Sequence, residues 1–206
     1  ERPGGDLPEW ATSGFRGDHY ALGEYLAENV LDQLPADVLD FLLATSILDR
    51  LCADLCAAVS GQAGSQYMLE FLEKQGLFIR PLDEHRQWYR YHHLFAAHLQ
   101  RRLQHQFPER KVQLHRAASA WFEVNADTDE AVTHALAVGD TARAIGLVER
   151  DAMRLVQYSA MSTLRMLVLR LPPDQLRERP ELQLAIAWAH CLTHRPAQAR
   201  ESLALV

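Results

Sequence analysis

The sequence has few cysteines and no long apolar run. Only Cys52, Cys56 and Cys191 occur among its 206 residues, an odd number in a chain long enough to bury a core without disulfide bonds. With no signal peptide at the start, we expect a reducing, cytoplasmic location. The longest apolar candidate, residues 182–189, is interrupted by Gln183 and is far shorter than the roughly 20 residues that cross a bilayer, which excludes membrane insertion.

Basic residues are also in the minority. The chain has 21 Lys plus Arg against 27 Asp plus Glu, a formal net charge of -6. Because a DNA backbone is attracted by basic surfaces, this balance disfavours strong DNA binding by this chain alone. The sequence also lacks the Gly-x-x-x-x-Gly-Lys-Ser/Thr loop of nucleotide hydrolases and the Gly-x-Ser-x-Gly turn of serine hydrolases, so it predicts no catalytic activity of its own.

What is present is a patterned, helix-rich chain. It begins at Glu1 instead of a methionine and stops at Val206 within a helical pattern, so we expect a piece of a longer protein. Apolar spacing from Tyr20 predicts a first helix that ends before Pro35. Three further helices are predicted from Pro35, over residues 53–59 and over residues 65–75, the last two closed by Gly61 and Gly76.

Two short strands and another helix follow. Residues 77–82 and 88–91 have strand character around a charged turn, and residues 93–105 have a helical apolar face. After Pro108 the pattern is helical only, with breaks at 125–128, 139–140, 159–162, 172–173 and 195–196. Trp121 and Trp188 are 67 residues apart (188 minus 121), about twice a ~34-residue tetratricopeptide (TPR) unit, and we expect both to pack between helices.

These patterns define a fold class and a division of the chain. We predict a mainly α protein, namely a winged helix-turn-helix with a small two-stranded wing followed by TPR-like α-helical hairpins. The predicted parts are a linker remnant over residues 1–18, a winged-helix domain over 19–107 and the start of a superhelical domain over 108–206.

Three ordered motifs carry a family resemblance. They are Phe15-Arg16-Gly17-Asp18 leading into Glu24-Tyr25-Leu26-Ala27-Glu28, then Phe41-Leu42-Leu43-Ala44-Thr45-Ser46-Ile47-Leu48-Asp49-Arg50-Leu51, and finally Tyr89-Arg90-Tyr91-His92-His93-Leu94-Phe95. Over roughly its first half, the chain resembles the MalT-like large ATP-binding regulators of the LuxR group, which are signal-transducing ATPases with numerous domains.

The resemblance implies a place in a larger regulator. In such proteins an ATPase domain precedes a winged helix, a superhelical sensor and a C-terminal DNA-binding helix-turn-helix. It implies that this chain is the non-catalytic middle, that ATP or ADP is a cofactor of the parent protein and not of the fragment, and that DNA is bound only through the absent C-terminal part. The implied partners are the ATPase domain of the same parent chain and an inducer or regulatory protein at the sensor, with oligomerisation of the parent on activation.

The same resemblance implies a latch in the resting state. The winged helix would fold back on the ATPase domain, and a histidine of the third motif would reach the diphosphate of bound ADP. His92 is the first candidate by its position and His93 the second. An imidazole suits this role because its N–H can donate a hydrogen bond to phosphate and it can carry charge near neutral pH.

These residues also have plainer interpretations. His92 and His93 could be only capping or interdomain residues, and Arg90 an exposed strand arginine. Cys52 and Cys56 are four apart and would share a helical face, but no second ligand pair follows at a zinc-finger spacing, so small apolar packing is favoured over a metal.

Other readings of the chain stay open as well. His190 and His194 would share one face of a helix, but two ligands do not complete a zinc site. A DNA-reading winged helix would place residues 65–75 in the major groove, yet this helix offers Glu70, Glu73 and a single lysine. The third alternative is a free-standing TPR-like scaffold for protein interaction.

Overall fold

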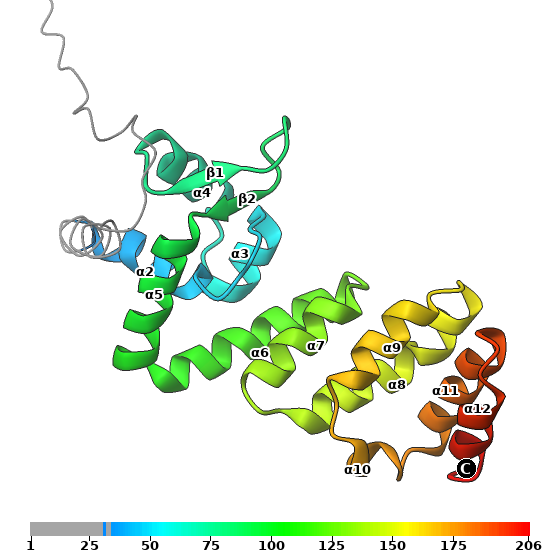
Figure 1. Cartoon of the computed structure of the whole chain (residues 1–206). Coiled ribbons are helices and arrows are strands. Elements are labelled where there is room, and N and C mark those ends of the chain that lie inside the picture. The colour runs from blue at the N-terminus through cyan, green and yellow to red at the C-terminus, as the bar shows by residue number, and fades with distance from the viewer. Residues whose placement is uncertain (1–30, 32–33) are drawn as a thin grey trace, which may run out of the picture.

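The computed structural model describes residue 31 and residues 34–206. Nearly all of the helix predicted before Pro35, and the linker predicted over residues 1–18, lie outside the described residues. The described chain forms two successive parts, a winged-helix lobe from α2 to α5 and a repeat lobe from α6 to α12 (Figure 1). The predicted fold class, a mainly α winged helix followed by helical hairpins, is confirmed.

The winged-helix lobe contains four described helices and a two-stranded sheet. Its elements are α2 (Ala36–Thr45), α3 (Ala53–Ser60), α4 (Ser65–Lys74), β1 (Ile79–Pro81), β2 (Tyr89–Tyr91) and α5 (His93–Gln106). The strands are antiparallel, with Ile79 opposite Tyr91 and Pro81 opposite Tyr89. Leu51 and Tyr89 exchange two backbone hydrogen bonds of 2.8 Å, so the segment between α2 and α3 is attached to the outer side of β2.

Glycines end two of these helices, as the sequence predicts. Gly61 follows α3 with φ +74° and Gly76 follows α4 with φ +67°. Both φ values lie in the left-handed region, which glycine adopts at little energetic cost because it has no Cβ. At the second turn, the N–H groups of Gly76 and Leu77 donate to the carbonyl oxygens of Glu73 and Leu72, both at 3.0 Å, which turns the chain into the wing.

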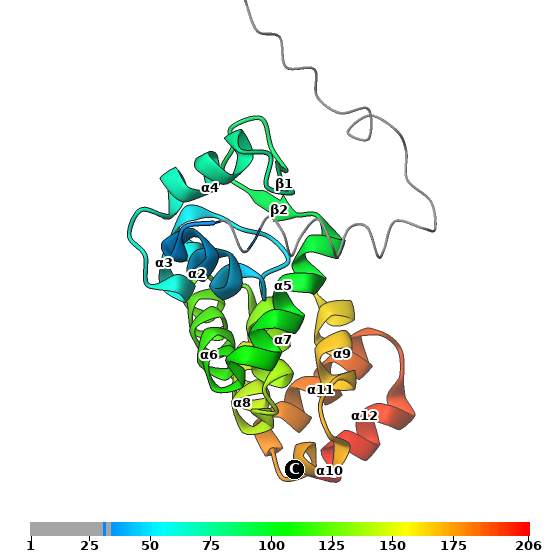
Figure 2. The same ribbon diagram turned by 90° about the vertical axis from the view of Figure 1, so that its left-hand side faces the viewer.

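The repeat lobe is built from helical hairpins. Its helices are α6 (Pro108–Val124), α7 (Thr128–Ala137), α8 (Thr141–Gln157), α9 (Met161–Leu169), α10 (Pro173–Leu176), α11 (Pro180–Leu192) and α12 (Pro196–Leu203). Adjacent helices pack as the pairs α6/α7, α8/α9 and α11/α12, which stack away from the winged-helix lobe (Figure 2). The carboxylates of Asp127 and Asp140 cap α7 and α8, and the one-turn α10 was not predicted.

One apolar core runs through both lobes. It includes Phe41 and Leu55 of the winged-helix lobe, Phe122 of α6 and Leu182 of α11. Helix α6 packs against both α3 and α5, so the first hairpin shares buried surface with the winged helix. The domain boundary predicted near residue 107 stays a prediction.

The two tryptophans do not share one environment. Trp121 packs partly buried against the core, but Trp188 is 51% exposed, so the prediction that Trp188 lies between helices is wrong. The reason is that α11 buries a different face, which contains Leu182 and the small side chains of Ala185 and Ala187. Within the described part of the chain, no helix combines the length and apolarity needed to cross a bilayer.

Candidate functional site

Two buried tyrosines of β2 anchor the histidine motif. The Tyr91 hydroxyl lies 2.8 Å from Oγ1 of Thr45, which donates in turn to the Phe41 carbonyl oxygen at 2.7 Å, so Tyr91 is the donor of this pair. Burial raises the pKa of Tyr91 well above its ordinary value, and the phenol stays neutral. The ring of Phe95 meets that of Tyr91 edge to face at 5.9 Å, while Tyr89 is fully buried. These contacts fix the junction between β2 and α5.

The two candidate histidines occupy that junction. His92 is the N-cap residue of α5 and His93 its first residue, and both side chains are exposed. The backbone N–H of His92 donates to the carbonyl oxygen of Phe78 at 2.6 Å, and the two imidazole rings are 4.5 Å apart between centroids. The backbone here is therefore fixed by the wing, whereas the rings face outward and are accessible to a partner.

The electrostatics of the junction favour an anion. Helix α5 has 14 residues and no acidic residue in its first turn, and its N-cap side chain makes no capping bond, so its N-terminal N–H groups present partial positive charge. Burial lowers the pKa of His92, and the nearby His93 and Arg80 lower it further, so this imidazole would serve an anion as a neutral N–H donor and not as a cation. A phosphate placed at this end would meet N–H donors, two imidazoles and Arg80.

The two histidines have different neighbours. His93 lines an open depression of about 340 Å³ between the 46–52 segment and α5, to which Asp49, Arg90 and Gln100 also contribute, whereas His92 does not line it. Nε2 of Gln100 donates to the Ser46 carbonyl oxygen at 2.7 Å. Arg90, the secondary phosphate candidate, forms an ion pair with the Asp49 carboxylate and also donates to its carbonyl oxygen at 3.1 Å.

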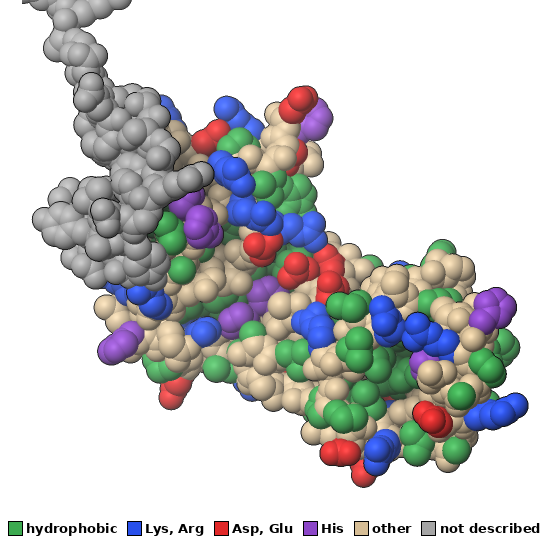
Figure 3. All heavy atoms as spheres, viewed as in Figure 1, with side chains coloured by type: hydrophobic (Ala, Val, Ile, Leu, Met, Phe, Trp, Pro, Cys, Tyr) green, Lys and Arg blue, Asp and Glu red, His purple; other side chains and the backbone are tan. Residues whose placement is uncertain are grey.

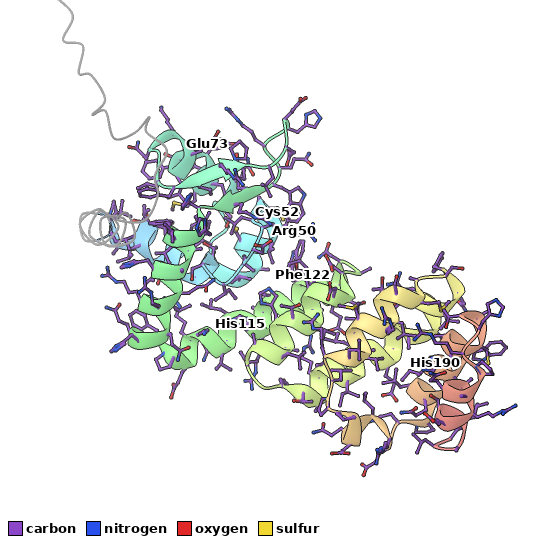
Figure 4. The ribbon with its side chains drawn as sticks, viewed as in Figure 1. Arg50, Cys52, Glu73, His115, Phe122 and His190 are labelled. Carbon is purple, nitrogen blue, oxygen red and sulfur yellow. The ribbon has the colours of Figure 1, made fainter. Side chains whose placement is uncertain are left out.

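A set of polar contacts between the lobes was not predicted. The guanidinium carbon of Arg50 lies 4.7 Å from the Trp88 ring centroid, and its Nη2 lies 2.6 Å from the Asp127 carboxylate. Arg50 comes from the segment before α3, Trp88 directly precedes β2 and Asp127 caps α7, so this contact joins the wing to the first hairpin. Figure 4 shows Arg50 on the side of the winged-helix lobe that faces Phe122 of α6.

A second ion pair connects the lobes at the other end of α6. Arg110, in the first turns of α6, binds Asp40 of α2 through both of its terminal nitrogens, with Nη2 2.7 Å from Oδ2. The hydrogen bond and charge of Asp40 raise the pKa of Arg110. Two arginine–carboxylate contacts thus hold the first hairpin to the winged-helix lobe, one at the start of α6 and one at the turn between α6 and α7.

The other candidate sites are not assembled for metal binding. Cys52 is the N-cap residue of α3, and Cys56 is buried, which raises the pKa of its thiol. The prediction that His190 and His194 share a helical face is wrong: α11 ends at Leu192, and His194 has a left-handed φ of +57° in the following turn. Among the described residues, no three His, Cys, Asp or Glu side chains cluster as metal ligands would.

The exposed face of α4 does not resemble a DNA-reading surface. Nε2 of Gln66 donates to the Glu70 carboxylate at 2.7 Å, and Glu73 lies 3.4 Å from Arg86 of the wing turn. Acidic side chains on this face would repel phosphates. Lys74 is the only basic residue that α4 itself contributes.

Comparison with known proteins identifies the winged-helix segment. Residues 27–111 match the family described as the MalT winged helix domain. This segment is a MalT winged helix domain. The family resemblance predicted from the sequence is confirmed, and both candidate histidines lie inside the matched residues.

Relatives that match most of this chain carry two kinds of name. The serine/threonine-protein kinase PknK of Mycobacterium tuberculosis (strain ATCC 25618 / H37Rv) is 44% identical over 202 residues, which are 98% of this chain and 18% of the kinase. The HTH-type transcriptional regulator MalT is 33% identical over 192 residues in Klebsiella pneumoniae (strain 342), 93% of this chain and 21% of the relative. MalT of Yersinia enterocolitica is 34% identical over 183 residues, 89% and 20% respectively. The chain therefore spans about a fifth of these relatives.

The MalT winged helix domain contains only part of the contacts described above. Arg50, Trp88 and Arg110 lie inside it, whereas Asp127 lies beyond residue 111. The similarity to the relatives continues through the repeat lobe, so the junction between the two lobes lies within the aligned region.

Proposed function

We propose that this chain is the non-catalytic coupling arm of a longer, ATP-dependent MalT-like regulator, and that it connects a nucleotide switch to a helical-repeat sensor. The observation that carries the proposal is the Arg50 contact, which joins the wing beside the histidine motif to the first hairpin. Relatives named as a kinase and as transcriptional regulators both contain this segment. A segment common to proteins whose names indicate different activities suits a regulatory role better than a catalytic one.

The coupling path is short. Trp88 is followed directly by β2, and β2 ends at Tyr91, next to His92. Arg50 packs on Trp88 and binds Asp127, whose carboxylate also accepts a hydrogen bond from the Glu130 N–H at 3.3 Å. A movement of the first hairpin would therefore act on the strand that positions the histidines. Inducer binding at the sensor would shift the equilibrium between a closed and an open form of the parent.

The histidines would provide the nucleotide end of this path. We propose that the winged helix docks on the ATPase domain of its own parent chain, with His92 as the first candidate and His93 as the second for the ADP phosphates. The start of α5 fits an anion because it combines helix N–H groups, Arg80 and a first turn without acidic residues. In the parent, exchange of ADP for ATP would change the phosphate charge that these residues contact.

Release of a fluorescent ADP from the full-length parent tests the latch. We expect His92→Ala to accelerate release about tenfold, which corresponds to the loss of one charge-assisted hydrogen bond, and His93→Ala to have a smaller effect. His105→Ala, an exposed histidine near the end of α5, is the matched control. Unchanged release in both the His92 and the His93 variants would refute the latch.

The coupling step needs a separate measurement. Arg50→Gln removes the charge that binds Asp127, and we expect it to weaken the effect of inducer on ADP release while basal nucleotide binding persists. Arg177→Gln, at an exposed arginine of the repeat lobe, is the control. Full inducer response in Arg50→Gln would exclude this path.

Titration of the 206-residue chain with duplex DNA at low salt tests the alternative function, in which the winged helix reads DNA. We expect no specific binding, because the α4 face is acidic. Tight binding with a steep salt dependence would instead identify a DNA-reading winged helix.

A further inference from the structure

The repeat lobe contains a hollow of about 450 Å³ between α9 and α11. The residues that line it include Leu164, Arg165, Val168, Ile186, His190 and Arg195. Figure 3 shows an apolar hollow bordered by basic side chains in this lobe, and Figure 4 labels His190 on α11. The volume lies within the range of about 300–1,000 Å³ that is typical of small-molecule sites.

The walls of the hollow are largely apolar because α9 and α11 contribute aliphatic side chains to it. Helices α9 and α11 both pack against α8, and between them the side chains of Leu164, Val168 and Ile186 face a shared space. Leu164 is buried, whereas Val168 and Ile186 are half-buried. An apolar ligand group placed here would remove their remaining surface from water.

The mouth of the hollow is positively charged. Arg165 of α9 and Arg195, which precedes α12, are both exposed, and in the described part of the chain neither forms an ion pair. By contrast, six arginines of the same lobe do so, namely Arg110, Arg143, Arg150, Arg154, Arg170 and Arg179. Burial and the charge of Arg195 lower the pKa of His190, while Glu201 opposes this shift.

We propose that this hollow binds a small organic anion with an apolar tail. The carboxylate or phosphate of the ligand would contact Arg165 and Arg195, and its tail would lie against Leu164, Val168 and Ile186. Guanidinium groups suit this task because they remain charged and bind carboxylate or phosphate through two parallel hydrogen bonds. This proposal assigns a class of ligand to the repeat lobe, and it does not depend on the proposed contact between His92 and ADP.

Calorimetric titration of the 206-residue chain with four probes that each carry a ten-carbon chain tests the proposal. We expect decanoate or decyl phosphate to bind, and decanol and decyltrimethylammonium to bind at least about tenfold more weakly, since they lack the anion. Comparison of the two anions shows which head group the site prefers. Equal binding of all four probes, or no binding of either anion, would overturn the proposal.

Matched variants locate the binding. We expect Arg165→Gln/Arg195→Gln to weaken anion binding about tenfold or more, while Arg177→Gln, also exposed and away from the hollow, binds like the unaltered chain. Circular dichroism before each titration shows that the variants are folded. Equal weakening in the double variant and the control would overturn the site.

The longer parent gives a further check. If decanoate binds the fragment but not the folded parent, another part of the parent covers the hollow and the ligand site is refuted. Retained affinity in the parent supports it. Because the titration measures binding alone, its failure leaves the ADP-release experiment on His92 unaffected, and the two proposals are tested separately.

Discussion

Two buried histidines in the first hairpin predict a marked loss of stability in acid. Nδ1 of His115 on α6 lies 2.9 Å from Nδ1 of His134 on α7, and these residues are only 7% and 3% exposed. The ring of Phe122 stacks on His134 with the centroids 5.5 Å apart. One imidazole donates its N–H and the other accepts, so the contact requires at least one ring to be neutral.

The magnitude follows from the pKa values. Burial lowers the pKa of each histidine from 6.5 to about 4. The unfolded chain therefore binds protons at a higher pH than the folded chain does. The stabilisation is complete above pH 6.5 and is lost as the pH falls toward 4. At pH 5 one such histidine lowers the free energy of unfolding by about 2 kcal/mol, and two by at most about twice that.

Urea unfolding followed by circular dichroism at pH 7.5 and pH 5.0 measures this loss. In His115→Leu/His134→Leu both partners become apolar, which removes the titration without leaving a polar group unpaired. Between pH 7.5 and pH 5.0 the free energy of unfolding falls in both proteins. We expect this fall to be about 2–4 kcal/mol smaller in the variant than in the unaltered chain. His105→Leu, at an exposed site on α5, is the control and should behave like the unaltered chain. An equal pH dependence in the double variant would refute the reasoning.

Two further predictions concern stability at neutral pH, measured by urea unfolding. Gly76→Ala should lower the free energy of unfolding by about 1 kcal/mol because φ is +67°, although no atom lies within 4 Å of the added Cβ. Gly146 lies within α8, and its added Cβ would also meet no atom within 4 Å. Gly146→Ala should therefore raise the free energy of unfolding by about 0.5–1 kcal/mol, because alanine favours the helix. The same sign at both positions would contradict the backbone argument. Tyr91→Phe should cost about 1 kcal/mol through loss of the bond to Thr45, and unchanged stability would show that this bond contributes nothing net.

Local signals in the sequence predicted most helix and strand positions. Gly61 and Gly76 indicated helix ends because glycine, which lacks a Cβ, adopts the left-handed backbone conformation at a low energetic cost. Both glycines have this conformation in the structure. Pro108, predicted as a boundary, and Pro196, predicted as part of a break, are the first residues of α6 and α12, a position that suits a residue without a donor N–H. The helical face predicted for His190 and His194 failed because α11 ends between them.

Contacts between distant segments could not be predicted in the same way. Arg50 and Asp127 are 77 residues apart, and neither has a sequence neighbour that indicates the other. The histidine motif was found from its strand-then-helix pattern. However, the different surroundings of His92 and His93 depend on Arg80 of β1 and on Asp49 of the preceding segment, which strand pairing and tertiary packing bring close. The exposure of Trp188 likewise depends on which face α11 packs on α8.

The Arg110–Asp40 and Arg50–Asp127 ion pairs couple the movement of α6 to that of the winged-helix lobe. Its 17 residues extend about 25 Å at about 1.5 Å per residue, with Arg110 held by Asp40 at one end and Asp127 by Arg50 just beyond the other. A helix pinned at two points cannot pivot on its own, so a turn of the winged helix by about 10° would sweep the far end of α6 through about 4 Å. Small angular changes of the winged helix would thus become displacements of several ångströms at the turn between α6 and α7.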